Sequence, residues 1–353
     1  MSSAEFIARH WSRRDAVALA LYPLSLAFRL LVAARRSGFR LGLFRSTRLA
    51  VPVIVVGNLT IGGSGKTPLV IALAQALARR GLRPGIVSRG YGSKAAAPRA
   101  VLATSLAEES GDEPLLLARR SGCPVWVGRD RAAAGAALLA AHPDCQLLLL
   151  DDGLQHYALA RDFEIAVEDA RGHGNGLMLP AGPLREPADR PVDARVINTE
   201  PADRPAAMPV DAIATVVNGA PLATTYATHT TYAMQLKTRR LYRLDDPARD
   251  VAPAALADLR LHGVAGIGNP ARFFAQIASL GLACVPHAFP DHHAYAPEQL
   301  RFDDCDAVLM TEKDAVKCER FGRTDLYALE VDAEIDPALI ELILRRLHGR
   351  TPA

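Results

Sequence analysis

The stretch that decides the fold is "VPVIVVGNLTIGGSGKTPL", residues 51–69. An apolar run, Val51–Val56, leads into a glycine-rich turn that ends in Gly65-Lys66-Thr67, and a helical pattern follows over Pro68–Arg80. A strand, a glycine-rich turn and a helix in this order are the context that a phosphate-binding P-loop requires. The stretch therefore predicts an α/β domain that binds a nucleotide.

Each residue type in the turn suits one part of a nucleotide. Backbone N–H groups are expected to converge on the β-phosphate, aided by the helix N-terminus, from Gly62, Gly63, Ser64 and Gly65. Lys66 would bridge the β- and γ-phosphates, and the Thr67 hydroxyl would bind Mg²⁺. The strict pattern has glycine at position 60, where this chain has Thr60. The alternative, a glycine-rich turn with a chance GKT, is disfavoured by the strand before it and the helix after it.

A second segment, "QLLLLDDGLQH" (146–156), supplies an acidic partner for the loop. Four leucines run directly into Asp151 and Asp152, as in the strand that holds Mg²⁺ in P-loop enzymes. An apolar strand ending in aspartate is also common in front of an ordinary turn. Downstream of a phosphate loop, the metal site is the better interpretation, with either aspartate as the direct ligand.

Short apolar runs and helical patterns alternate along the chain. Further strands are predicted at Pro84–Val87, Pro124–Val127, Leu147–Leu150, Phe163–Val167 and Arg195–Asn198, and helices at Pro114–Arg120 and Arg131–Ala141. Continuous apolar strands between helices indicate a parallel sheet covered on both faces. We therefore predict an α/β P-loop core with helices on both faces of its sheet.

The chain changes character after this core. The Thr- and Tyr-rich segment 224–244 predicts an antiparallel strand. A second α/β stretch follows, with strands at His262–Ile267 and Ala307–Met310 and helices at Pro270–Leu280 and Pro337–Leu347. The predicted parts are a basic N-terminal segment (1–48), a nucleotide-binding domain (49–222), a β-type connection (223–250) and a smaller C-terminal α/β domain (251–353).

Charge is unevenly distributed. The net charge of the 353 residues is +3, but residues 1–50 contain nine arginines, no lysine and two acids, which gives +7 and leaves −4 for the rest. A basic arm on a mildly acidic body favours an anionic neighbour, either a membrane or a nucleic acid. The chain offers no aromatic residues in a basic groove, so no nucleic-acid partner is expected. Five scattered cysteines without a C-x-x-C pair indicate a reducing compartment, and so a chain that faces the cytoplasm.

The N-terminal arm carries an apolar stretch, Ala16–Phe28, between arginines. Its length falls short of the roughly 20 residues that span a bilayer. A secretory signal is a poor fit because arginines continue to Arg48 and no small-residue cleavage site follows. An interfacial helix on an anionic membrane surface is predicted, with a helix packed on the protein's own core as the alternative.

Further motifs occur in order between residues 57 and 317: "SRGYG" (88–92), "GDEP" (111–114), "GRDR" (128–131), "GPLREP" (182–187), "FPDHHAY" (289–295) and "TEKDAVK" (311–317). Together with the two segments above, they resemble the tetraacyldisaccharide 4′-kinase family of the lipid A pathway in Gram-negative bacteria. In that family a threonine at position 60 is ordinary.

The resemblance implies transfer of the ATP γ-phosphate to the 4′-hydroxyl of a tetraacylated glucosamine disaccharide 1-phosphate, giving lipid IVA. It implies ATP and Mg²⁺ as cofactors and the cytoplasmic face of the inner membrane as location, with the N-terminal helix peripheral or shallowly inserted. Asp112 corresponds to the catalytic aspartate, and His292 to its partner, with His293 as the less favoured choice. Without the resemblance, Asp112 would be interpreted as a helix N-cap.

The resemblance also implies roles for other residues, although their residue types alone point to these roles less specifically. Glu186 would approach Mg²⁺ and Arg185 would hold a phosphate, unless the two form a loop salt bridge. Substrate or nucleotide contacts are also implied for Arg89, Arg129, Arg131, His156, Lys313 and Lys317, although surface or helix-end roles explain these residues equally well.

Two other enzyme classes share the loop. A membrane-associated ATPase switch of the partitioning or targeting type would hydrolyse ATP and would need no base for a sugar hydroxyl. A ligase that forms an acyl phosphate and joins an amine would differ in its product. The pairing of Asp112 with His292 is the feature that separates the kinase from the switch.

Overall fold

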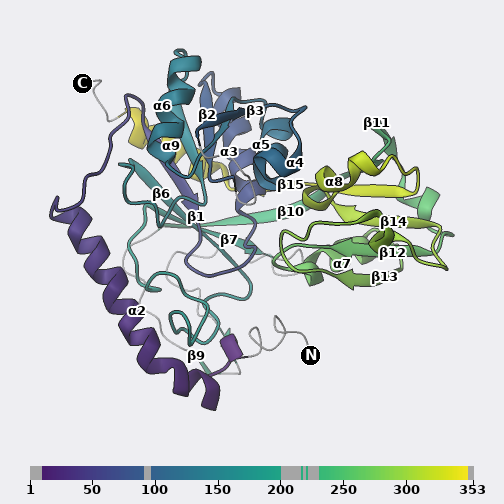
Figure 1. Ribbon diagram of the computed structural model, residues 1–353, viewed down its shortest axis with the longest axis horizontal. Helices are drawn as coiled ribbons and strands as arrows, with labels where there is room; N and C mark the ends of the chain where they lie inside the picture. Colours follow the sequence, from purple (N-terminus) through teal and green to yellow (C-terminus); the bar gives the residue numbers. More distant parts are fainter. Residues whose placement is uncertain (1–9, 91–96, 200–215, 218–219, 222–229, 349–353) are drawn as a thin grey trace.

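A mixed sheet of thirteen strands runs through the molecule from end to end (Figure 1). The computed structural model describes residues 10–90, 97–199, 216–217, 220–221 and 230–348. One group of strands surrounds the phosphate loop: β1 (Val53–Gly57), β2 (Pro84–Ser88), β3 (Arg99–Val101), β4 (Val125–Val127), β5 (Leu147–Asp151), β6 (Phe163–Asp169) and β7 (Ala194–Thr199). With the helices α3 (Lys66–Arg79), α4 (Ala107–Ser110), α5 (Asp112–Ser121) and α6 (Arg131–Ala141), these strands form the first lobe.

The second lobe is smaller and has its own strands and helices. It comprises β12 (Leu261–Ala265), β13 (Cys284–Ala288) and β14 (Ala307–Thr311), with the helices α7 (Pro270–Ser279) and α8 (Glu312–Cys318). Short 3₁₀ turns occur at Pro253–Leu256 (η2), Pro297–Leu300 (η3) and Glu319–Phe321 (η4). Two short strands, β8 (Val216–Val217) and β9 (Ala220–Pro221), form a separate pair.

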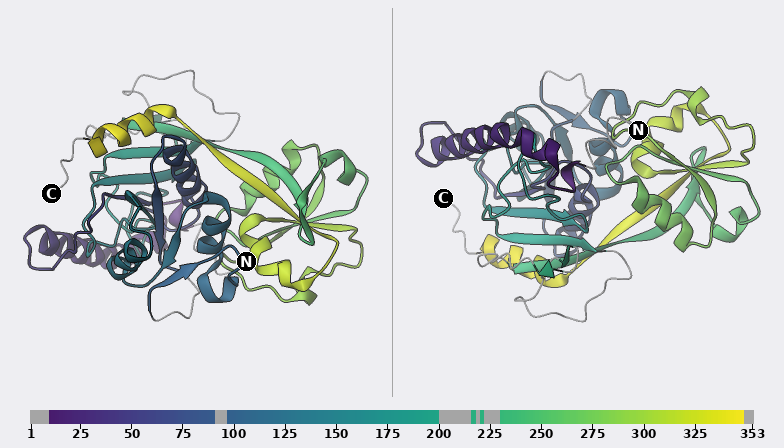
Figure 2. Two further views of the ribbon diagram at one scale, coloured as in Figure 1. Left: turned by 90° about the horizontal axis from the view of Figure 1, so that it is seen from above. Right: turned by 90° about the horizontal axis from the view of Figure 1, so that it is seen from below.

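Two long strands join the lobes. β10 (Thr230–Arg243) and β15 (Leu326–Ile335) are antiparallel neighbours, and both continue from one lobe into the other (Figure 2). β11 (Asp246–Val251) folds back on β10. The order across the sheet is β13-β12-β14-β15-β10-β7-β6-β1-β5-β2-β4-β3, so a single hydrogen-bonded sheet underlies both lobes.

The prediction of a P-loop core is confirmed. β1 pairs in parallel with β5 and β6, and its side chains alternate between two apolar cores. Ile54 and Val56 face the core that includes α3, whereas Val53 and Val55 face the core that includes α6. Because both faces are covered, the strand is apolar at consecutive positions rather than at alternate ones.

The Thr- and Tyr-rich segment is partly as predicted. β10 pairs antiparallel with β15 and β11, but it also pairs in parallel with β7. Residues 224–229 of the predicted strand lie outside the described residues. The boundaries predicted between the parts of the chain remain a prediction. The helix α9 (Pro337–His348) packs in the core of the first lobe through Leu339, Ile340 and Ile343.

The helix α2 (Ala16–Arg40) lies along one side of the first lobe, on the far side from the second lobe (Figure 1). Asp15 caps its start by accepting a hydrogen bond from the Ala18 N–H at 3.0 Å, and the Ser25 hydroxyl donates to the Met178 carbonyl at 2.7 Å. Most of its apolar side chains face outward, with Leu30 71% and Leu31 67% exposed. At 25 residues it is longer than the stretch predicted from sequence, and by length and composition it can cross a membrane.

Candidate active site

The phosphate loop follows β1 and ends at the first turn of α3, as the sequence predicts. Gly65 is the N-cap of α3 with φ 94°, and a Cβ there would lie 2.5 Å from the Asn198 amide nitrogen, so the position requires glycine. The first N–H groups of α3 have no acceptor within the helix and point toward the loop. The site is therefore suited to an anion.

Thr60 stands where the strict pattern has glycine. It forms an isolated β-bridge with Leu184, and the next N–H, of Ile61, donates to the Pro183 carbonyl at 2.9 Å. The loop begins extended at this point, which a β-branched residue adopts easily. Its later turn is fixed by Asn58, whose amide donates to the Gly62 carbonyl at 2.9 Å.

The two aspartates after β5 have different surroundings. Asp152 lies 3.0 Å from Arg185 and 3.9 Å from Lys66. Burial alone would raise the pKa of Asp152, but these two cations lower it to about 2. Asp152 is therefore ionised and already neutralised by the protein.

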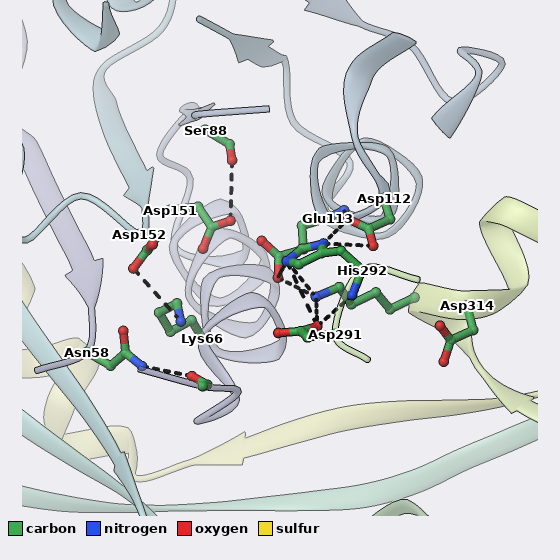
Figure 3. Close-up of polar contacts among 12 residues, drawn as sticks. Asn58, Lys66, Ser88, Asp112, Glu113, Asp151, Asp152, Asp291, His292 and Asp314 are labelled. Carbon is green, nitrogen blue, oxygen red and sulfur yellow. Dashed lines mark hydrogen bonds and ion pairs between the residues drawn. The ribbon is translucent and has the colours of Figure 1, made fainter. Parts of the chain in front are cut away.

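Asp151 forms no such ion pair with a described residue. Its side chain is buried, Oδ1 has no hydrogen-bond partner among the described residues, and Oδ2 has only a 3.4 Å contact from the Ser88 hydroxyl (Figure 3). Burial, and next the charge of Glu113, raise the pKa of Asp151 to about 7. A buried carboxylate oxygen without a partner among the described residues suits a cation. Thr67, at the start of α3, lines the cleft together with Asp152, the residue after Asp151.

Asp112 and His292 come together where the two lobes meet, although 180 residues separate them. The His292 ring nitrogen Nδ1 lies 3.0 Å from each Asp112 carboxylate oxygen (Figure 3). Asp112 is the first residue of α5, after its N-cap Gly111, so the N-cap interpretation of Asp112 is wrong by one position. His292 has a left-handed backbone with φ 60° and donates its N–H to the Gly266 carbonyl at 3.3 Å.

The two side chains stabilise each other's charge. Burial opposes ionisation of Asp112, but the hydrogen bond from His292 and nearby lysines lower its pKa. Burial likewise opposes protonation of His292, yet the hydrogen bond to Asp112 raises the pKa of the ring. The pair is therefore a carboxylate held by an imidazole that carries a proton more readily than usual.

Two lysines of α8 surround this pair. Lys313 lies 2.8 Å from Glu113 and 3.0 Å from Asp291. Burial alone would lower the pKa of Lys313, but these acids raise it. Lys317 lies 2.8 Å from Asp314 and 3.7 Å from Asp112. Both predicted lysines therefore lie beside the pair, on the second-lobe side of the cleft.

Other predicted residues are placed differently. Glu186 is buried against Tyr157, whose hydroxyl donates to it at 2.5 Å, and it lies 4.0 Å from Arg36 of α2. It does not line the cleft, whereas its neighbour Arg185 does. His293 contacts Gln299 at 3.1 Å within the second lobe, so only His292 contacts Asp112.

The remaining predicted residues are three arginines and one histidine. Arg89 lines the cleft, and Arg129 is exposed. Arg131 is buried near both aspartates; burial and the charge of Arg89 lower its pKa. Burial and nearby arginines lower the pKa of His156 to about 4, so this ring is neutral.

Several functional side chains gave no recognisable signal in the sequence. Arg171 donates to the Gly63 carbonyl of the loop at 2.9 Å and to the Gly268 carbonyl of the second lobe at 3.0 Å. Asn198 donates to the Ser64 carbonyl at 3.1 Å. Asn198 is the second-last residue of β7 and Arg171 follows β6, and polar residues near strand ends are the only clue that such a role leaves in a sequence.

The cleft between the lobes has a volume of about 480 Å³. The phosphate loop and Asp152 line one wall, His292 and Lys313 line the other, and the far end is apolar, with Leu236, Phe273 and Leu329. No group of three or more His, Cys, Asp or Glu side chains within the described ranges forms a metal site by itself. A cation bound here therefore needs further oxygens from a ligand or from water, as Mg²⁺ does at nucleotide phosphates.

The fold and this cleft define the chain as a P-loop nucleotide-binding protein of the kinase type. A family model described as Tetraacyldisaccharide-1-P 4'-kinase matches residues 17–348. The chain belongs to the tetraacyldisaccharide 4′-kinase family. The resemblance predicted from the motifs is thereby confirmed, and so is the class of enzyme, an ATP-dependent kinase of lipid A biosynthesis, over the ATPase switch.

Individual relatives agree along the whole chain. The tetraacyldisaccharide 4'-kinase of Dechloromonas aromatica (strain RCB) is 48% identical over 354 residues, which cover 99% of each chain. That of Methylobacillus flagellatus is 47% identical over 347 residues, 98% of this chain and 97% of the relative. The crystal structure of LpxK from Aquifex aeolicus in complex with ATP superposes with a TM-score of 0.74 at 28% identity, covering 94% of this chain and 99% of the other.

Proposed function

We propose that this chain transfers the γ-phosphate of ATP to the 4′-hydroxyl of a tetraacylated glucosamine disaccharide 1-phosphate, forming lipid IVA. The observation that carries the proposal is the Asp112–His292 pair, whose imidazole lines the same cleft as the phosphate loop. An ATPase that merely hydrolyses its nucleotide has no need of a carboxylate–imidazole pair formed between two lobes. A kinase with an alcohol acceptor needs a group that receives the hydroxyl proton.

ATP would lie along the cleft, with its phosphates on Gly62–Thr67 and its base at the apolar end. The backbone N–H groups of the loop and Lys66 would hold the β- and γ-phosphates. Leu236, Phe273 and Leu329 offer the apolar surface that a purine ring requires. The second lobe thus contributes to binding of the base as well as to the chemistry.

Residues suited to Mg²⁺ are present on the first lobe. Thr67 and Asp151 would hold the ion directly, because Asp152 is already paired with Lys66 and Arg185. When bound, Mg²⁺ neutralises charge that builds up between the β- and γ-phosphates. Glu186, also predicted near Mg²⁺, accepts a hydrogen bond from Tyr157 and does not line the cleft.

Asp112 would act as the base. Its lowered pKa keeps it ionised, and a weak base is sufficient because the acceptor hydroxyl loses its proton late in a loose transition state. The 4′-oxygen forms a bond to the γ-phosphorus, the bond to the bridging oxygen of ADP breaks, and the hydroxyl proton passes to Asp112. His292 would orient the carboxylate, and Lys313 would offset the charge of the acids around it.

The substrate carries four acyl chains, so the enzyme would act at a membrane surface. α2 exposes Leu19, Leu30 and Leu31 and has arginines near both ends. Such a helix suits an anionic leaflet, with the apolar side chains in the acyl boundary and the arginines at the headgroups. We infer attachment at the cytoplasmic face of the inner membrane.

The test uses detergent-solubilised protein with Mg²⁺-ATP labelled at the γ-position, with and without the tetraacyl disaccharide 1-phosphate. Lys66→Ala, Asp112→Ala and a control, Glu109→Ala on the surface of α4, run alongside. The expected result is label in the lipid, lost in the first two variants and kept in the third. Label released only as inorganic phosphate, regardless of lipid and of Asp112, would contradict the proposal and favour an ATPase.

A further inference from the structure

The helices α5 and α8 belong to different lobes, and both start at the cleft. α5 begins with Asp112 and Glu113, and α8 begins with Glu312 and Lys313. For Asp112 to meet His292, the start of α5 must be held in a fixed place relative to the second lobe. The contacts at the two ends of α5 show what holds it.

Two consecutive residues of α8 contact opposite ends of α5. Lys313 lies 2.8 Å from Glu113 at the start of α5, whereas Glu312 contacts Arg120 near its end. The Arg120 guanidinium Nη1 lies 2.7 and 2.6 Å from the two Glu312 carboxylate oxygens. Both side chains of this second pair are more than nine-tenths buried, at 9% and 8% exposure.

The second terminal nitrogen of the Arg120 guanidinium contacts β15, one of the two strands that join the lobes. This nitrogen, Nη2, lies 3.1 Å from Glu330 and also contacts Asp332, both on β15. Glu330 in turn pairs with Arg239 and Arg240 of β10. Arg120 therefore links α5, α8 and the two connecting strands at a single buried point.

Stability alone is a poor reason for such a cluster. A buried ion pair often contributes no more than well-packed apolar residues would, because desolvation offsets the attraction. What a planar guanidinium adds is geometry, since it holds several carboxylates at defined angles, which lysine cannot do. A misplacement of about 1 Å in an active site can cost about 10²-fold in rate.

We propose that Arg120 and Glu312 are positioning residues, which hold α5 against α8 so that Asp112 is presented to His292. This inference rests on the proposed kinase function. Arg120 acts from the end of the helix that Asp112 starts, and Glu312, which lines the cleft, acts from the residue next to Lys313.

The chain provides a matched control. Arg119, the residue before Arg120 on α5, pairs with Glu319 of η4, directly after α8. This pair also joins the two lobes, but its side chains are 28% and 27% exposed and neither lines the cleft. Glu312→Gln and Glu319→Gln therefore make the same chemical change in two ion pairs that join α5 to the second lobe.

The experiment measures kcat and KM for lipid phosphorylation, together with the melting temperature, for Glu312→Gln, Arg120→Lys and Glu319→Gln. Each change is made in the wild-type chain and in a His292→Ala background. We expect Glu312→Gln and Arg120→Lys to lower kcat about tenfold with the KM for ATP changed less than about twofold, since positioning affects the transition state more than nucleotide binding. Glu319→Gln should leave both constants unchanged.

The variants made in the His292→Ala background supply the decisive measurement. If Glu312 acts by presenting Asp112 to His292, its loss should cost less than about twofold once His292 is absent, because effects of coupled residues do not add. A tenfold loss that persists in His292→Ala, or a loss no larger than that of Glu319→Gln, overturns the inference. Should Glu312→Gln fail to fold, Arg120→Lys keeps the charge and gives the same test. If the wild-type chain itself transfers no label to lipid, the proposed function fails instead.

Discussion

The two walls of the cleft are built in different ways. On the first-lobe wall, the phosphate loop and the Asp151–Asp152 pair follow adjacent parallel strands, β1 and β5. On the opposite wall, Asp112 and His292 come from different lobes and meet only because α5 and α8 pack together. The first wall consists of two contiguous segments, whereas the second exists only once the whole chain has folded.

The walls also differ in how their charges are balanced. Asp112 has His292 as a partner and Asp152 pairs with two cations, whereas Asp151 forms no ion pair with a described residue, although the charges of Lys66 and Arg131 act on it. The second wall is thus neutralised by the protein itself, while the first wall keeps one carboxylate that a bound cation would complete. The difference suggests that the first wall depends on its ligand and the second depends on lobe contacts.

The largest expected effect is on the first wall. Lys66→Ala removes the cation that would stabilise the charge of the γ-phosphate during its transfer. We therefore expect the rate of lipid phosphorylation to fall by about 10³-fold or more. The initial rate of label transfer measures it. Lys237→Ala, in an exposed pair on β10, is the control and should keep full activity. Retention of a tenth of the rate by Lys66→Ala would place the phosphates elsewhere.

The next effect concerns stability without nucleotide or Mg²⁺. The pKa of Asp151 is about 7 in the folded protein and 3.8 as the reference, so the folded state loses stability as pH rises from 3.8 to about 7. Asp151→Asn lacks this cost, and at pH 8 it should be more stable by on the order of 1–3 kcal/mol. Urea unfolding at pH 5 and pH 8 measures the difference. An equal effect of the substitution at both pH values would show that Asp151 is not a buried, unpaired acid.

A smaller effect sharpens the comparison at the second wall. His292 has a pKa raised above 6.5 by its hydrogen bond to Asp112, so its contribution to stability is complete below pH 6.5 and is lost as pH rises through the folded value. In Asp112→Asn the pKa of His292 should fall, because burial is then unopposed by the carboxylate. NMR titration of the ring follows this directly. A pKa that does not move on substitution of Asp112 would mean that the two residues are not paired in solution.

The smallest effect is at the start of α8. The Thr311 hydroxyl accepts a hydrogen bond from the Asp314 N–H as the N-cap of this helix. Thr311→Ala should cost about 1 kcal/mol of unfolding free energy, whereas Thr311→Ser should cost less than half of that. Chemical denaturation measures both. Equal losses in the two variants would assign the effect to the methyl group instead of the cap.

The same contrast explains what could be predicted from the sequence. The loop at 62–67 and the strand before Asp151 were recognisable because backbone geometry and apolar runs leave local patterns. Asp112 and His292 were identified only through the family resemblance, since neither carries a local signal of its partner. Glu113, Arg171 and Asn198 were missed because their contacts depend on how the lobes meet. β15 was missed as well, because it contains charged residues such as Glu330. Glu330 can be buried because it forms ion pairs, and a hydropathy pattern does not reveal such pairs.

The place of α9 has a consequence for how the protein is made. The last helix of the chain covers the same core as α3, the helix that begins at the phosphate loop. A nascent chain leaves the ribosome from its N-terminus, so the nucleotide lobe has an open apolar face until α9 has been made. The strand order adds to this delay, because β10 waits for β15 before its second edge is paired. The core beneath the phosphate loop is therefore covered only after α9 has been synthesised, and premature termination before α9 would yield a chain prone to aggregation.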